Sequence, residues 1–322
     1  LLLSFILILT TSNFGLTFFV FNVDAPSVQF EVFFGIYSKA VKGVYASVSE
    51  DDILHICQGI SMLADTKSSV KKLFMLDSVP LDALVSDLRP DAQPEGIPSQ
   101  LHQAIVYTRR LGCLFKCVKD RFCIYLSEEM EDFWDIFGFL LEYVESVESV
   151  CSIFIEIVGR YPEAHKGMLP IHRAIVDSVQ SSYEESPKPS LVRVASEIVK
   201  VFGKKSENDV LDDTVGENVF QDHVAMEKFI VSLMKSTRPL FTHAQAFSED
   251  GDLVKSTLEL GLACIKYYPP LVVQSGVLTT LLDISMLGLS LPDSCDSRPL
   301  ILDLTSYSTC LSLETTAMMK FW

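Results

Sequence analysis

Basic residues are scarce in this sequence. The chain has Lys+Arg 26 against Asp+Glu 42, which gives a formal net charge of −16 over 322 residues. Nucleic-acid binding requires clustered Lys and Arg to neutralise phosphates, so the charge balance argues against nucleic acid as the main ligand. The same balance favours a basic partner.

Cysteines are also few, with eight in the whole chain, and most of them sit inside apolar runs. This number is too small for a disulfide scaffold and predicts reduced thiols, as in the cytosol or nucleus. Cys113, Cys117 and Cys123 form the only cluster in the sequence. Because Cys113 and Cys117 lie one helical turn apart on an apolar face, we interpret them as core residues rather than zinc ligands.

Catalytic and nucleotide-binding signatures are missing. The sequence contains no Gly-rich phosphate loop, no His-Glu-x-x-His and no Gly-x-Ser-x-Gly. His165 and His172, with Glu163 nearby, lack a second pair of ligands, so we interpret them as loop or core histidines. The sequence therefore predicts no enzyme, no cofactor and no metal site.

Residues 1–23 carry no charge at all. Their length fits a membrane span, but they lack the basic start and small-residue cleavage site of a secretory signal. The favoured alternatives are a buried helix of a larger fold or translated non-coding sequence at a gene-model boundary. We therefore separate residues 1–26, of doubtful status, from residues 27–322, and expect no membrane partner.

From Ser27 onward the apolar residues recur at helical spacing, with almost no alternation of period two. The pattern predicts an all-α fold. Pro189 and Gly203 mark the start and stop of one helix, while Pro80 predicts an interruption in another. Predicted helices lie near residues 30–41, 50–63, 68–88, 99–118, 127–144, 145–158, 168–179, 191–202, 220–235, 253–267 and 271–287.

One sequence pattern, a predicted helix that ends at Tyr-Pro and is followed by a second apolar helix, occurs twice. A predicted helix ends at Tyr161-Pro162 and another ends at Tyr268-Pro269, 107 positions later, and each is followed by a second apolar helix. This spacing suits two copies, more than one unit apart, in an array of α-hairpins of roughly 40–47 residues each. Such hairpins stack into an α-α superhelix, or solenoid, in which each unit covers its neighbour. A single globular α-bundle is the alternative.

The longest acidic loop spans residues 204–218 and contains Asp209, Asp212 and Asp213. It is interpreted either as a solvated loop or as an electrostatic contact for a basic partner.

Several helical phrases together resemble the importin-β (karyopherin) superfamily, in its transportin-3/importin-13 branch. Their order and spacing match the second half of such a receptor, over about residues 27–307. The phrases are HICQGISMLA (residues 55–64), IPSQLHQAIVYTRRLGCLF (97–115), FWDIFGFLLE (133–142), SLVRVASEIVKVFG (190–203) and the stretch from Asp252 to Leu289.

The resemblance implies a superhelix of HEAT repeats that shuttles between nucleus and cytoplasm. In that family cargo proteins lie on the concave face, the small GTPase Ran bound to GTP displaces them in the nucleus, and outer grooves bind Phe-Gly repeats of nuclear pore proteins. The family's Ran-binding repeats lie near the N-terminus of the full receptor, so we expect conventional Ran binding from the full-length protein rather than from this chain alone.

In family members that import SR-rich splicing factors, an arginine-lined helix binds phosphoserines. The corresponding helix here, residues 145–160, carries Glu145, Glu148 and Glu156 and only Arg160 as a base. An acidic helix repels phosphoserine, which favours an unmodified basic cargo. Glu145, Glu148, Glu156, Asp209, Asp212 and Asp213 are thus the candidate cargo-binding residues, unless they are ordinary solvated surface.

The leading hypothesis from the sequence is a nuclear import receptor for basic cargo. The second hypothesis is a helical-repeat scaffold without a transport role. The third is a membrane-anchored helical protein.

Overall fold

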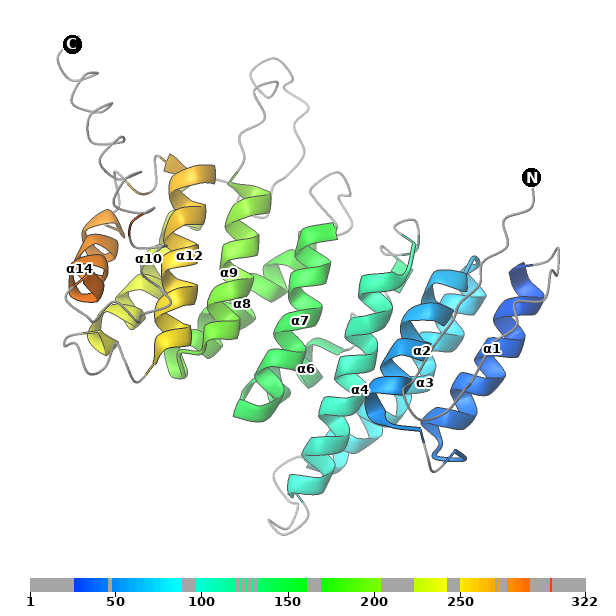
Figure 1. Cartoon of the computed structure of the whole chain (residues 1–322). Helices are drawn as coiled ribbons and strands as arrows, with labels where there is room; N and C mark the ends of the chain where they lie inside the picture. The colour runs from blue at the N-terminus through cyan, green and yellow to red at the C-terminus, as the bar shows by residue number, and fades with distance from the viewer. Residues whose placement is uncertain are drawn as a thin grey trace, which may run out of the picture. The chain divides into compact units, whose positions relative to one another are not determined.

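The sequence folds into two units of α-helices, and within each unit helices that are near one another in the chain pack together. A computed structural model describes residues 26–45, 48–88, 97–119, 122, 125–126, 129, 133–160, 169–203, 223–241, 250–269, 272, 277–289 and 302. These residues contain eleven α-helices and no strand, so the predicted all-α helical-repeat class is confirmed (Figure 1). The chain divides into an N-terminal unit, residues 1–129, and a C-terminal unit, residues 130–322.

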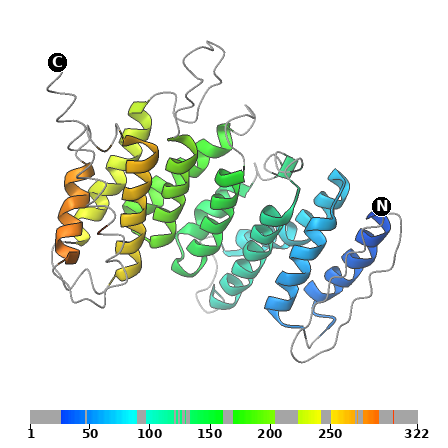
Figure 2. The same ribbon diagram turned by 45° about the horizontal axis from the view of Figure 1, so that its top comes forward.

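The N-terminal unit contains two helical hairpins. The first pairs α1 with α2 and the second pairs α3 with α4, and α2 packs against α4 across the hairpins. This alternation places α1 and α3 in one layer and α2 and α4 in the other (Figure 2). The helices are α1 (Pro26–Val41), α2 (Glu50–Leu63), α3 (Lys67–Leu88) and α4 (Ile97–Cys117).

The C-terminal unit continues the same two-layer pattern. Helices α7, α9 and α12 pack successively in one layer, while α6, α8, α10 and α14 pack successively in the other. The helices are α6 (Trp134–Leu141), α7 (Val144–Arg160), α8 (Leu169–Glu185), α9 (Pro189–Phe202), α10 (His223–Thr237), a short 3₁₀ turn (Arg238–Leu240), α12 (Gly251–Tyr267) and α14 (Val277–Leu289).

The predicted repeat is visible in these boundaries. Helix α7 begins at Val144 and α12 at Gly251, which are 107 positions apart, and both belong to the same layer. Helix α9 lies between them and begins at Pro189, 45 positions after α7. That spacing is within the range expected for α-hairpin repeats. The step from α9 to α12 is longer because it includes the acidic loop.

Local sequence signals set several helix ends. Ser49 caps α2: its hydroxyl accepts a hydrogen bond from the Asp52 N–H at 3.2 Å, and the Asp52 carboxylate accepts one from the Ser49 N–H at 3.2 Å. This reciprocal pair satisfies two N–H groups at the helix start. Helix α9 ends before Gly203, as predicted, and begins at Pro189, two residues before the predicted start at Leu191.

Gly203 also permits a close contact between helices. A Cβ atom there would lie 2.5 Å from the Val199 carbonyl oxygen and 3.1 Å from that of Tyr267. Both neighbours are backbone atoms, which cannot rotate aside as a side chain can. The glycine therefore lets the end of α9 touch the end of α12.

The predicted interruption at Pro80 is wrong, because α3 runs from Lys67 to Leu88 with Pro80 inside it. A proline in a helix interior removes one hydrogen bond and costs about 3 kcal/mol. Buried side chains on both sides of it, including Phe74 and Leu81, hold the helix in place. Helix α7 similarly continues one residue beyond the predicted stop at Gly159.

A buried polar network joins all four helices of the N-terminal unit. The Tyr37 hydroxyl (α1) donates to Asp77 Oδ2 (α3) at 3.1 Å, and Arg110 Nη1 (α4) lies 3.4 Å from Asp77 Oδ1. Arg110 Nη2 is also 3.4 Å from Glu50 Oε1, on α2. The Cys57 thiol donates to the Arg110 carbonyl oxygen at 3.6 Å. Burial is the largest influence on Asp77 and raises its carboxyl pKa to about 6.

The core of the C-terminal unit is mostly apolar. Phe154 is fully buried, and its ring centroid lies 5.9 Å from those of Trp134 and Phe137. His172 is buried against the Phe202 ring at 5.1 Å, which confirms its interpretation as a core residue, and burial lowers its pKa to about 4. His165 and Cys123 lie outside the described residues.

The described helices include none with both the length and the apolarity needed to cross a bilayer. Residues 1–23 lie outside the described part, so the structure leaves the membrane-span interpretation of that segment untested.

Candidate functional site

The three predicted carboxylates of the 145–160 helix lie on one face of α7. Glu145 and Glu148 are exposed, Ser152 is exposed and Glu156 is half-buried, at the three- and four-residue steps of a helix face. The opposite face contributes the buried side chains Val147, Val150, Cys151, Ile153, Phe154, Ile157 and Val158. The sequence pattern thus placed these carboxylates on the solvent side of the helix.

Asp209, Asp212 and Asp213, the other predicted cargo contacts, lie outside the described residues. The structure therefore does not test these three residues, and their role stays a prediction.

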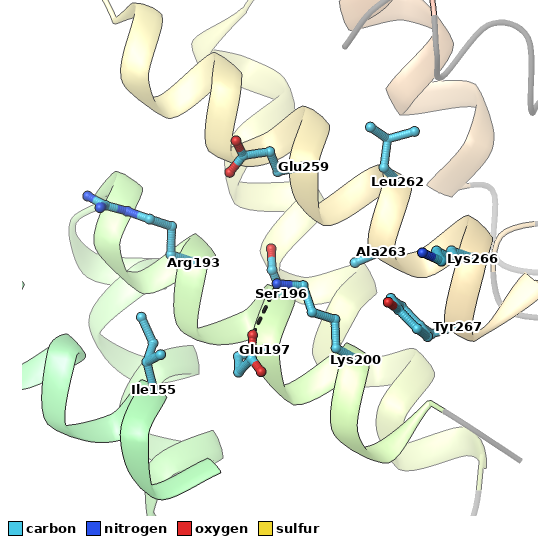
Figure 3. A pocket seen from close by; sticks show the side chains of 10 residues that line it. All are labelled: Ile155, Arg193, Ser196, Glu197, Lys200, Glu259, Leu262, Ala263, Lys266 and Tyr267. Carbon is cyan, nitrogen blue, oxygen red and sulfur yellow. Dashed lines mark hydrogen bonds and ion pairs between the residues drawn. The ribbon is translucent and has the colours of Figure 1, made fainter. Parts of the chain in front are cut away.

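Helices α7, α9 and α12 together form a continuous exposed surface, here called the α7–α9–α12 surface, and it contains a groove of about 480 Å³. Figure 3 shows the residues that line the groove, which come from all three helices. They are Ile155 from α7, then Arg193, Ser196, Glu197 and Lys200 from α9, and finally Glu259, Leu262, Ala263, Lys266 and Tyr267 from α12.

Close helix packing shapes one side of the groove. A Cβ atom at Gly159 of α7 would lie 3.3 Å from Glu197 Oε1 of α9, tighter than an ordinary contact. The absence of a side chain at this position leaves room for Glu197 above α7. Ser196 does not offer its hydroxyl to a ligand, because it donates to the Val192 carbonyl oxygen at 3.1 Å.

Two of the cations in the groove already have acidic partners. Arg193 Nη1 lies 3.6 Å from Glu148 Oε1, and Lys200 Nζ lies 3.0 Å from Glu197 Oε2 (Figure 3 draws the second pair). The Arg193–Glu148 pair is exposed and the Lys200–Glu197 pair is half-buried, and solvent screens both, so each contributes about 1 kcal/mol or less. The surface around the acidic α7 helix therefore carries charges of both signs.

Two other charges lie on α12 without an ion pair among the described residues. The Glu259 carboxylate is half-buried, and the Lys266 ammonium stands 5.3 Å from the centroid of the Tyr267 ring. Leu262 lies between them on the same helix. The groove thus has an apolar centre with one available carboxylate and one available ammonium.

Sequence reasoning identified only the α7 side of this surface. Arg193, Lys200, Glu259 and Lys266 were missed, because they lie between 37 and 121 positions from the α7 carboxylates along the chain. Their exposed spacing on α9 and α12 was readable from the helical pattern. Which helices lie beside α7 was not, since that depends on the order of packing in the layer.

The groove is lined by charged, aromatic and apolar side chains. Its lining contains neither a histidine nor a cysteine, and its one serine is engaged with the backbone. Burial raises the pKa of the Cys57, Cys151 and Cys264 thiols to about 12, so these thiols are protonated and poor nucleophiles. No three His, Cys, Asp or Glu side chains in the described ranges gather as metal ligands would.

Comparison with known proteins relates this chain to a transportin. No protein-family model matches the chain. The protein named Transportin MOS14, from Arabidopsis thaliana, is 22% identical to it over 285 residues, which cover 83% of this chain and 27% of that protein. The chain is therefore distantly similar to a transportin, across most of its own length and about a quarter of the relative's. The branch within the importin-β superfamily and the place of this chain in a longer receptor stay predictions.

Proposed function

We propose that this protein is a nuclear transport receptor of the importin-β type, and that its α7–α9–α12 surface binds a basic segment of a cargo protein. The distant similarity to a transportin over 83% of the chain is the observation that carries this proposal. The helical-hairpin architecture and the exposed carboxylates of α7 support it. In this proposal the receptor shuttles between nucleus and cytoplasm, acts by binding rather than catalysis, and requires no cofactor.

The α7 carboxylates suit this role because each is accessible from the same side. Glu145, Glu148 and Glu156 would accept hydrogen bonds from Lys or Arg of the cargo. Exposed ion pairs are individually weak, so affinity depends on several of them acting together and falls with salt. Weak, additive contacts also allow a competitor to release the cargo.

Release is proposed to follow from competition between cargo and Ran bound to GTP. Two ligands that favour different conformations of one receptor lower each other's affinity by the same factor. Phe-Gly nucleoporins would bind elsewhere on the helical array during passage through the pore. These partners are proposed for the full-length protein.

The proposal is tested with the protein expressed in full from its own gene, immobilised and incubated with cell extract. GTP-locked Ran is added to one of two samples, and bound proteins are identified by mass spectrometry. We expect basic nuclear proteins to bind and Ran-GTP to release them. Partners that bind only with Ran-GTP would indicate export. If the same proteins are bound with and without Ran-GTP, the result would contradict a transport role and support a scaffold without one.

Replacing the α7 carboxylates tests where the cargo binds. The variant Glu145→Gln, Glu148→Gln, Glu156→Gln should bind a basic cargo segment about tenfold more weakly, because up to three carboxylates are lost and Arg193, then without Glu148, adds a cation that repels the cargo. Its affinity should also fall less steeply with salt. Fluorescence anisotropy with a labelled basic peptide at several salt concentrations measures both effects.

A control variant removes the same charge from the other layer. Asp135 lies on α6, and Asp177 and Glu185 lie on α8, and all three are exposed. Asp135→Asn, Asp177→Asn, Glu185→Gln should retain wild-type affinity. If both triple variants lose affinity equally, net charge rather than α7 determines binding.

A further inference from the structure

The available charges of the groove define a recognition site distinct from the α7 carboxylates. Glu259, Leu262 and Lys266 lie on one face of α12 at steps of three and four residues. Seven residues of α-helix advance about 10 Å, so the backbone positions of Glu259 and Lys266 are roughly that far apart along the helix axis. Both point toward the same groove as Ile155 and Ala263 (Figure 3).

The other charges of the groove are already balanced. Arg193 is held by Glu148 at 3.6 Å and Lys200 by Glu197 at 3.0 Å. A partner that enters the groove therefore meets Glu259 and Lys266 as the charges without an ion pair in the described part of the chain. Its own charges must be opposite to these two and similarly spaced.

We propose that the groove binds an extended peptide segment in which one basic and one acidic residue, three positions apart, flank an apolar residue. The basic residue pairs with Glu259, the acidic residue pairs with Lys266, and the apolar residue packs against Leu262, Ala263 and Ile155. This inference rests on the proposed function, because it names the cargo feature read by part of the α7–α9–α12 surface.

The spacing follows from backbone geometry. In a polyproline II segment, residues three positions apart lie on the same side and are separated by about 9 Å. That separation matches the two-turn spacing of Glu259 and Lys266 on α12. The segment needs no partner strand and leaves its own backbone hydrated, as an open groove requires. The groove volume of about 480 Å³ is sufficient for a short stretch of peptide.

Segments of a single charge fit this groove less well. A uniformly basic segment would place a cation beside Lys266, and a uniformly acidic or phosphorylated one would place an anion beside Glu259. Like charges brought together at an interface are repelled and act against the wrong partner. The groove therefore selects mixed charge, whereas the carboxylates of α7 select basic residues.

The test measures which peptides the protein prefers. Fluorescein-labelled peptides with a Lys-Leu-Pro-Glu core, the reversed Glu-Leu-Pro-Lys core, an all-Lys version and an all-Glu version are titrated with the full chain by fluorescence anisotropy. Wild-type protein should prefer a mixed peptide over both single-charge peptides by about tenfold, the effect of one well-placed charge pair. Both mixed orders are included because an extended segment can run either way along α12.

Charge reversal of the groove should then change the preference in a defined way. Glu259→Lys gives two cations and should favour the all-Glu peptide, while Lys266→Glu gives two carboxylates and should favour the all-Lys peptide. The double variant should recover the preference for mixed peptides. Circular dichroism confirms that each variant remains helical.

Matched controls lie on the same helix outside the groove lining. Asp252 and Lys255 are exposed on α12, so Asp252→Lys and Lys255→Glu make the same kinds of charge change nearby. They should leave the order of peptide preference unchanged. The inference is overturned if the mixed peptides do not bind wild-type protein, if charge reversal does not change the preference, or if the controls change it equally. Ran-sensitive cargo release by the full-length protein would still stand in those cases, so failure of this inference is separable from failure of the proposed function.

Discussion

Arg110→Met should lower the free energy of unfolding of the N-terminal unit by about 3–5 kcal/mol at neutral pH, the usual cost of removing one partner of a buried ion pair. The side chains of Arg110 and Asp77 are each 3% exposed, so Asp77 would remain buried without a counter-charge. Urea denaturation of the full chain, followed by peptide-resolved hydrogen exchange over α1–α4, measures the loss.

The effect of this substitution should depend on pH. In the folded protein the pKa of Asp77 is raised to about 6, mainly by burial. The neutral carboxyl therefore stabilises the fold, and this stabilisation is fully present below the pKa that Asp77 has in the unfolded chain. That stabilisation is lost as pH rises through about 6 and the carboxyl ionises inside the protein. Loss of the Arg110 charge removes a counter-ion that is needed only above this pH. The defect of Arg110→Met should therefore be smaller at pH 5 than at pH 7.5.

The double variant Asp77→Leu, Arg110→Met is the control for this prediction. Apolar replacement of a whole buried ion pair is often neutral, because the desolvation cost disappears together with the attraction. The double variant should regain part of the lost stability, since Asp77→Leu also removes the acceptor of the buried Tyr37 hydroxyl, and should lose the pH dependence between 4 and 6. If it is as unstable as Arg110→Met, packing of the arginine stem rather than its charge accounts for the effect.

Phe154→Ala should destabilise the C-terminal unit by about 3–5 kcal/mol, the range for removing a large aromatic side chain from a core. Phe154 is fully buried on α7 and contacts the rings of Trp134 and Phe137. Its removal leaves a cavity between α6 and α7. Thermal and urea unfolding monitored by Trp134 fluorescence reports this loss close to the site of the change.

Phe139→Ala provides the comparison on the same hairpin. Phe139 is half-buried and its ring is tilted against that of Tyr143, with centroids 5.1 Å apart. Phe139→Ala removes less buried apolar surface than Phe154→Ala does. The expected loss in free energy of unfolding is therefore less than half that of Phe154→Ala. Equal losses for the two substitutions would contradict the assignment of Phe154 to the centre of the core.

Helix ends were predictable where a local signal decides them. Ser49 with Asp52, and Pro189 with Gly203, act through backbone groups within a few residues, so their effect is readable from sequence. Pro80 misled because its local cost is outweighed by contacts of α3 with its neighbours, which only the packed fold contains.

In the candidate site too, features set by local sequence were predictable, whereas features set by contacts between helices were not. The exposed face of α7, with Glu145 and Glu148, followed from helical periodicity alone. The pairing of Glu148 with Arg193 joins two helices in successive hairpins, and no local pattern indicates it. The groove charges Glu259 and Lys266 were hidden for the same reason.

Hydrogen bonds between helices distinguish the N-terminal unit from the α7–α9–α12 layer in a mechanical sense. In the layer of α7, α9 and α12, Ser196 and Thr257 donate to carbonyl oxygens of their own helices, at 3.1 and 2.8 Å. The facing surfaces of α9 and α12 are thus held together mainly by apolar contact, which has little directional preference. In the N-terminal unit, the hydrogen bonds of Tyr37 and Arg110 to Asp77 cross between helices and fix their register.

Sliding two helices past each other costs more when it breaks directional bonds than when it only rearranges van der Waals contacts. The N-terminal unit should therefore be elastically stiff, and the α7–α9–α12 layer should be compliant. A compliant layer can widen or narrow its groove by small shear between α9 and α12 without losing a buried hydrogen bond. One groove could then accept peptide segments of somewhat different width at similar energetic cost.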